Sequence, residues 1–222
     1  MVDVDFGALV PYLPEFLRGI RATVLYASAS LCLASILGLA VAMARRSEFR
    51  PLRWGSQVYV DLIRGTPALV QIFFIYFGLP AVGIYISAPL AGIIAIGLNS
   101  GGYLAEIFRA GIAGVDRGQV EAGRSIGMSR SQTFRRVVLP QAMRLAVPSA
   151  AGEFTNLVKG TSLLSTISIT ELTRVAQQVV SVTFRPIEAY LAVALVYLVL
   201  NSAISHGSNW LERSLRRGEG LQ

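Results

Sequence analysis

Apolar residues gather in five long stretches of this chain, which short polar segments separate. The stretches cover residues 22–44, 58–79, 88–108, 145–167 and 187–206. A helix of 18 or more apolar residues is long enough to cross the hydrocarbon core of a bilayer. The pattern predicts an all-α membrane protein with about five transmembrane helices, which form one domain over residues 1–222.

Charged residues are few, and their placement orients the predicted helices. The chain is 53% hydrophobic and 15% charged, with a net charge of +7, whereas soluble domains average about 25% charged residues. Most arginines follow the first stretch, separate the third from the fourth, or occupy the C-terminal tail. The positive-inside rule assigns these three segments to the cytoplasm, with the C-terminus inside and the N-terminus outside. Because the arginines flank spans and form no stripe with stacking aromatics, no nucleic-acid partner is expected.

Polar residues interrupt the second and the fourth stretch. The second contains Arg64-Gly65-Thr66-Pro67, where proline removes a backbone donor and loosens the preceding turn. The fourth contains Glu153, Asn156, Lys159 and Gly160. We expect freed backbone groups and hydroxyls at these breaks to line a polar cavity. A simple packing kink is the alternative for the second stretch.

Glu153 is the most informative polar residue within a predicted span. It lies about eight residues beyond the cytoplasmic end of the fourth stretch, which in a helix is roughly 12 Å into the membrane. A carboxylate near the bilayer centre is costly and is by default functional. It is interpreted either as a ligand for a cationic group of a substrate or as a member of a structural ion pair, and both interpretations stay open.

Other residues in the two interruptions join Glu153 as candidate substrate ligands. Asn156 lies three residues from Glu153 and can reach it, whereas Lys159 lies about 120° around the helix. The full candidate set is Glu153, Asn156, Thr66, Gly65, Arg64 and Lys159.

Three local patterns add detail to this outline. Asp61 with Arg64, and Glu106 with Arg109, have the i, i+3 spacing of ion pairs on a helix, and a structural role is predicted for both pairs. Residues 169–182 are predicted to form a short amphipathic helix at the outer surface, where it contacts a binding protein or braces the interface.

Catalytic and metal chemistry is not expected. Cys32 is the single cysteine and His206 the single histidine, so we expect neither an internal disulfide nor a metal site. The sequence has no G-x-x-x-x-G-K-[ST] phosphate-binding pattern, so no ATP is bound by that route and no cofactor is expected. The first residues lack a basic segment, so no cleavable signal peptide is expected.

The basic segment 114–140 carries a spaced motif. It reads Glu121-Ala122-Gly123, then Gly127, then Val137-x-Leu139-Pro140. This resembles the EAA loop of ABC-transporter permeases, E-A-A-x3-G-x9-I-x-L-P, with the spacing intact. The resemblance implies a short cytoplasmic helix that docks into a groove on an ATPase subunit. The coupling residues that it implies are Glu121, Ala122, Gly123, Gly127, Leu139 and Pro140.

Gly123 departs from the motif, which has alanine at that position. Glycine inside a helix costs roughly 1 kcal/mol relative to alanine. Gly123 is therefore expected to weaken the docking helix or to let the partner's backbone approach closely.

Further segments resemble the polar amino-acid permeases. Residues 61–80 are similar to the second span of that family, residues 103–112 to its third, and residues 153–163 to its fourth. The resemblance covers nearly all of residues 15–215. The chain is identified as similar to permease subunits of histidine, arginine and glutamine importers, with the MetI-like fold of type I ABC importers. Gly152 and Gly160 depart from the family pattern near the presumed substrate path, so the substrate's identity stays open.

This resemblance implies a complete assembly in the bacterial inner membrane. Two permease subunits, either two copies or one copy with a similar paralogue, sit in lipid and form the path. Two ABC ATPase subunits supply the energy, and an extracytoplasmic amino-acid-binding protein delivers an amino-acid substrate. A stand-alone channel, an ion-coupled secondary carrier and a purely structural membrane subunit are the alternatives.

Overall fold

A computed structural model describes residues 4–217, and within them every regular element is helical. A short 3-10 helix over Phe6–Tyr12 leads into the first long helix. The α-helices are α1 (Leu13–Ala44), α2 (Arg50–Gly65), α3 (Ala68–Phe73), α4 (Leu79–Ala81), α5 (Ala88–Ala113), α6 (Arg117–Ser125), α7 (Arg130–Thr133), α8 (Leu139–Gly160), α9 (Leu172–Thr183) and α10 (Pro186–Arg217). Single turns of π-helix join α3 to α4 (Phe74–Gly78) and α7 to α8 (Phe134–Val138), and a 3-10 helix follows α8 (Thr161–Ile167).

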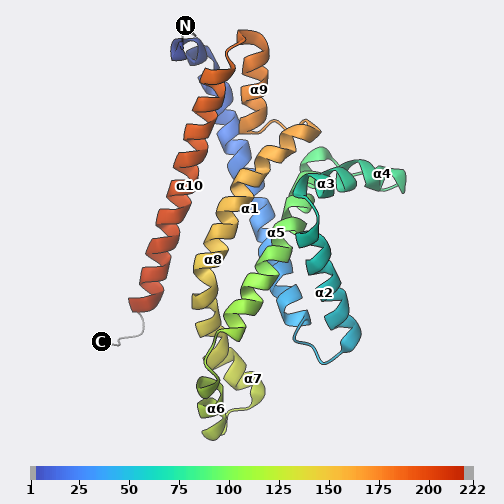
Figure 1. Cartoon of the computed structure of the whole chain (residues 1–222), viewed down its shortest axis with the longest axis vertical. Coiled ribbons are helices and arrows are strands. Elements are labelled where there is room, and N and C mark those ends of the chain that lie inside the picture. Colours follow the sequence, from blue (N-terminus) through green and yellow to red (C-terminus); the bar gives the residue numbers. More distant parts are fainter. Residues whose placement is uncertain (1–3, 218–222) are drawn as a thin grey trace.

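Three helical segments among the described residues are long and apolar enough to cross a membrane. They are Phe6–Ala44, Ala88–Ala113 and Pro186–Trp210, and a fourth crossing is added if the bent pair of α2 with α3–α4 counts as one span. Helix α8 does not reach the same apolarity, because Glu153, Asn156 and Lys159 lie within it. It nevertheless runs along α5 and α10 for much of the length of the molecule (Figure 1). The expected number of five spans therefore stays a prediction.

The second apolar stretch is not one straight helix. Thr66 and Pro67 both have extended backbones, with φ −125° and ψ 146° at Thr66 and φ −63° and ψ 137° at Pro67. The residue before a proline avoids the helical region for steric reasons. The two helical parts consequently meet at 111°. The predicted break is confirmed, but it is a sharp turn of the chain rather than a loosened turn within one span.

Among the described helices, α1 and α5 share the most extensive contact, and small residues allow it. A Cβ atom built on Gly38 would lie 2.7 Å from the Cβ of Leu104. Ala34, Ala105 and Gly101 on the facing surfaces are also buried. The hydrophobic effect does not drive helices together in lipid. Close van der Waals packing therefore supplies much of the contact energy between them. These two helices form the scaffold on which the other elements rest.

The predicted amphipathic helix near residues 169–182 is α9, which begins a few residues later. The Glu171 carboxylate caps its first turn by accepting from the backbone N–H groups of Thr173 (2.9 Å) and Arg174 (2.7 Å). The apolar face of α9 packs between α1 and α10 through buried residues that include Leu172 and Val175. Helix α9 and the N-terminal segment lie at one end of the molecule, and α6 and α7 lie at the opposite end (Figure 1).

Candidate functional site

A cavity of about 280 Å³ lies where α3, α5, α8 and the 3-10 turn after α8 meet. Most of its lining is aliphatic. Its polar lining residues are Asn99, Ser100, Tyr103, Glu153 and Asn156. A mostly apolar cavity with a few converging polar groups is the usual form of a small-molecule site.

Glu153 is the charged residue that lines this cavity. The residue is 8% exposed, and the side chains of Ser100 on α5 and Asn156 on α8 lie beside its carboxylate. Within residues 4–217, no Arg or Lys side chain forms an ion pair with it. Two carboxylate oxygens offer about four acceptor sites, so capacity remains for a ligand. The expected contact between Asn156 and Glu153 is confirmed, and the described chain contains no structural ion pair for Glu153.

The other predicted ligands lie outside this cavity. Lys159 is exposed, as its angular separation from Glu153 on α8 implies. Arg64, Gly65 and Thr66 are exposed at the end of α2. The Arg64 guanidinium lies 5.7 Å from the centre of the Tyr103 ring, so it contacts a cavity residue without lining the cavity. The substrate-binding roles of these four residues stay predictions.

Three polar lining residues on α5 escaped the sequence-based candidate set. Asn99, Ser100 and Tyr103 come from the middle of the third apolar stretch. The available signal was the pair Asn99-Ser100 inside a predicted span, since polar residues within membrane helices usually have a function. Gln71 was also absent from that set, and its side-chain oxygen accepts from the Asn99 amide nitrogen at 3.0 Å.

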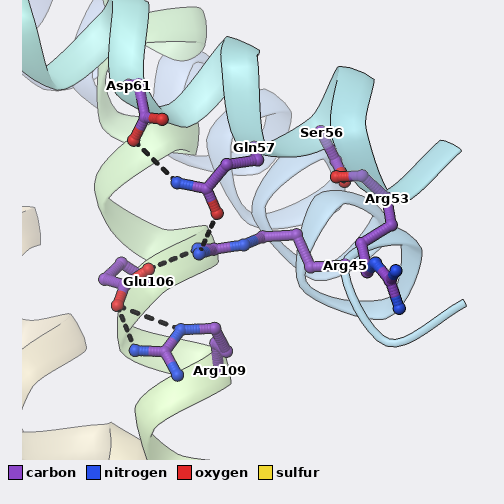
Figure 2. A network of polar contacts seen from close by, with 7 residues as sticks. All are labelled: Arg45, Arg53, Ser56, Gln57, Asp61, Glu106 and Arg109. Atoms are coloured by element: carbon purple, nitrogen blue, oxygen red, sulfur yellow. Dashed lines mark hydrogen bonds and ion pairs between the residues drawn. The ribbon is translucent and has the colours of Figure 1, made fainter. Parts of the chain in front are cut away.

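A second polar cluster joins α1, α2 and α5 near the end of the molecule that carries α6 (Figure 2). Glu106 forms ion pairs with both Arg45 and Arg109. Arg45 also donates to the Gln57 side chain, whose amide nitrogen donates to Asp61 at 2.8 Å. The predicted Glu106–Arg109 pair is confirmed. The cluster ties three helices together and lies apart from the cavity lining.

The predicted ion pair between Asp61 and Arg64 is wrong. Within the described part of the chain, Asp61 accepts from Gln57, one turn earlier on α2, and Arg64 turns toward the Tyr103 ring. Spacing along a helix brings several side chains within reach. Here the Gln57 amide bonds to Asp61 in place of Arg64, and the Tyr103 ring contacts Arg64 in place of Asp61.

The segment with the EAA-like motif contains a short helix, as the resemblance implies. Asp116 caps α6 by accepting from the Gly118 N–H at 2.7 Å. Glu121 and Ala122 are exposed on α6. The chain then turns at Gly127, whose φ of +85° lies in the left-handed region, where glycine carries no steric cost.

Gly123 is buried against the next turn of the same chain. A Cβ atom built on it would lie 3.2 Å from the Cγ2 of Thr133. Gly123 thus packs against Thr133 of the same chain, and the approach of a partner's backbone stays a prediction. Leu139 and Pro140 directly follow the π-helical turn Phe134–Val138 and begin α8.

A small apolar cluster connects α6 with the two helices that carry most polar lining residues of the cavity. Val120 of α6 packs against a buried cluster of Ile112 on α5, Val138 in the π-helical turn and Ala142 on α8. The Arg46 guanidinium lies 5.3 Å from the centre of the Phe134 ring, so the end of α1 also contacts this region. Residues of α5, α6 and α8 thus share one apolar cluster.

Residues 34–217 match the family model described as "Binding-protein-dependent transport system inner membrane component". The chain belongs to this family. The permease is 38% identical over 216 residues to the probable glutamine ABC transporter permease protein GlnM of Bacillus subtilis (strain 168), covering 97% of the permease and 98% of that relative.

Two solved structures agree with the fold of the permease. The crystal structure of an amino acid ABC transporter with histidines matches with a TM-score of 0.91 and 38% identity, over 96% of the permease and 100% of that chain. The inward-facing MetNI methionine ABC transporter matches with a TM-score of 0.78 and 20% identity, over 93% and 98%. The second match shows the fold alone. The permease therefore has the MetI-like fold and is a multi-pass component of the inner membrane.

Proposed function

We propose that this permease is the membrane-spanning subunit of an ATP-driven importer for amino acids, and that the cavity beside Glu153 is part of its transport path. The observation that carries the proposal is a buried carboxylate with spare acceptor capacity in a cavity between α5 and α8. Similarity to a glutamine permease and to an amino acid transporter over nearly the whole chain supports the substrate class. The carboxylate accepts the ammonium group that amino acids share.

The permease works in an assembly of several subunits. Two permease chains, either identical or similar, form the path, and each holds one ATPase subunit beneath α6. A binding protein delivers the amino acid at the end that carries α9. This arrangement puts the N-terminus outside and the C-terminus in the cytoplasm, and the opposite placement of α6 and α9 in the molecule supports it.

Energy reaches the cavity through the apolar cluster that α6 shares with α5 and α8. The ATPase contacts the exposed residues Glu121 and Ala122, and its movement shifts α6 as a rigid unit. Val120 passes that shift to α5 and α8 through Ile112 and Ala142. Both helices line the cavity, so the shift opens the cavity to one side of the membrane and closes it to the other. Such coupling requires that the ATPase bind the two states with different affinities.

Copurification and transport together test this proposal. The permease is purified from detergent with its genomic neighbours coexpressed, and the complex is placed in liposomes with ATP inside and a panel of twenty labelled L-amino acids outside. A stoichiometric ATPase and ATP-dependent uptake of at least one amino acid are expected. Uptake without an ATPase supports the channel or carrier instead, and an ATPase-free complex without uptake supports a structural subunit.

A further inference from the structure

Gln71 lies in α3, and its side chain reaches back to the sharp turn after α2, where backbone carbonyl groups lose their helical partners. Its side-chain nitrogen donates to the carbonyl oxygens of Ile63 (2.9 Å) and Thr66 (3.2 Å) and to the Thr66 hydroxyl oxygen (2.8 Å). The Thr66 hydroxyl donates its own hydrogen to the Leu62 carbonyl at 2.7 Å, so it accepts from Gln71. All three partners are acceptors, and only the NH₂ group of Gln71 can bond to them.

This requirement fixes the orientation of the Gln71 amide and of the amide it contacts. With its nitrogen held at the turn, Gln71 directs Oε1 toward α5. The Nδ2 atom of Asn99 lies 3.0 Å from that oxygen and donates to it. A flipped Asn99 would bring two carbonyl oxygens together, which is repulsive. The Asn99 amide is therefore set by a chain of hydrogen bonds that begins at the backbone of α2.

The Oδ1 atom of Asn99 is left without a hydrogen bond among the described residues, although Asn99 lines the cavity. Other polar groups also line the cavity. The side chains of Ser100 and Asn156 lie beside the Glu153 carboxylate in the cavity lining. The tyrosine hydroxyl of Tyr103 can donate or accept. The Glu153 carboxylate and the Asn99 Oδ1 atom are thus two acceptors among the lining residues, one negative and one neutral.

We infer that Asn99 is a second acceptor for the ammonium group of the transported amino acid, and that Gln71 is the positioning residue that keeps its oxygen turned into the cavity. The inference rests on the proposed function. An ammonium group has three N–H donors and needs more than one acceptor once it leaves water. A neutral amide oxygen meets that need without a second negative charge, so a substrate with a single positive charge is balanced by Glu153 alone.

The test measures how strongly the permease itself prefers a ligand with an ammonium group to one without it. The permease–ATPase complex is purified in detergent without any binding protein. Binding is measured by equilibrium dialysis for the best-transported member of the twenty-amino-acid panel and for its α-hydroxy acid, which keeps the carboxylate and side chain but lacks the ammonium. The ratio of the two affinities reports recognition of the ammonium, and a variant that only loosens the fold lowers both affinities together.

Asn99→Leu is expected to lower that ratio about tenfold or more, since a hydrogen bond to a charged group is lost. Gln71→Met leaves the Asn99 amide free to turn, so the ratio falls as well. The double variant should fall no further than Asn99→Leu alone, because both changes remove one interaction. Leu98→Met, a volume-conserving change beside Asn99, is the control and keeps the ratio. Asn99→Ala replaces the leucine variant if that complex does not assemble.

The outcomes separate the inference from the function on which it rests. A wild-type complex that binds no amino acid of the panel overturns the proposed function. Binding by the wild type with an unchanged ratio in Asn99→Leu and Asn99→Ala overturns the role of Asn99 alone. A ratio that falls in the Asn99 variants but not in Gln71→Met overturns the positioning role of Gln71.

Discussion

The Arg45 guanidinium forms an ion pair with the Glu106 carboxylate and so joins the end of α1 to α5 (Figure 2). The two side chains are 14% and 26% exposed. Glu106 also binds Arg109 on its own helix. One carboxylate therefore neutralises two arginines at the point where α1, α2 and α5 meet, beside the segment that leads into α6.

Loss of this carboxylate should destabilise the permease. Glu106→Gln leaves Arg45 and Arg109 close together without a counter-charge, and we expect a loss of about 1–3 kcal/mol. The measurement is thermal unfolding of the purified protein in detergent, with a lower midpoint expected for the variant. Asp61→Asn is the matched control, because Asp61 is exposed and accepts one bond from Gln57. Equal midpoints for both variants would contradict the prediction.

Two glycines of the EAA-like motif should respond differently to substitution. Gly127 has a φ of +85°, where a β-branched side chain is strained by about 1–2 kcal/mol. Gly127→Val is expected to misplace α6 and to reduce ATPase copurification. Gly123→Ala is the control, since its added methyl group meets a side-chain methyl of Thr133 at 3.2 Å and alanine favours the helix. If both variants retain the ATPase equally, the turn at Gly127 does not position α6.

The exposed carboxylate on α6 should be needed for attachment of the ATPase. Glu121→Lys reverses a charge on the surface proposed to dock, and like charges across an interface cost several kcal/mol. We expect loss of the ATPase from the complex and loss of ATP-dependent uptake. Glu15→Lys reverses an exposed charge at the opposite end of the molecule and should leave copurification intact. Substrate-stimulated ATP hydrolysis that is unchanged in Glu121→Lys would remove α6 from the coupling path.

The long apolar stretches predicted which long helices form more reliably than the angles at which helices meet. Helices α1, α5 and α10 follow from length and hydropathy alone, because a buried or lipid-facing helix must be apolar along its whole length. The break at Thr66–Pro67 also follows from local chemistry. The 111° angle at this break does not follow from the local sequence. It depends on how α3 packs against α5 and on which side chain donates to the freed carbonyl groups.

The site was predictable only where its residues share one helix. Glu153 and Asn156 lie one turn apart on α8, so spacing alone brought them together. Asn99 and Ser100 enter from α5, and Gln71 of α3 bonds to Asn99, so their place at the cavity depends on tertiary contacts. Lys159 shares the helix of Glu153 but faces another direction. The Asp61–Arg64 pair failed because other partners within reach competed for both side chains.

Glu153→Gln separates the two interpretations of the buried carboxylate. Glutamine keeps the shape of the side chain and removes the negative charge that would balance a substrate ammonium. If Glu153 is a ligand, uptake should fall about tenfold or more, because a charge-assisted hydrogen bond is weakened. The free energy of unfolding should stay the same or rise, since a neutral amide costs less to bury than a carboxylate. Uptake by reconstituted liposomes and thermal unfolding measure the two quantities, and Ser149→Ala, at an exposed position on α8, is the control. Unaltered uptake together with lower stability would instead make Glu153 a structural residue, with an ion-pair partner supplied from outside the described chain.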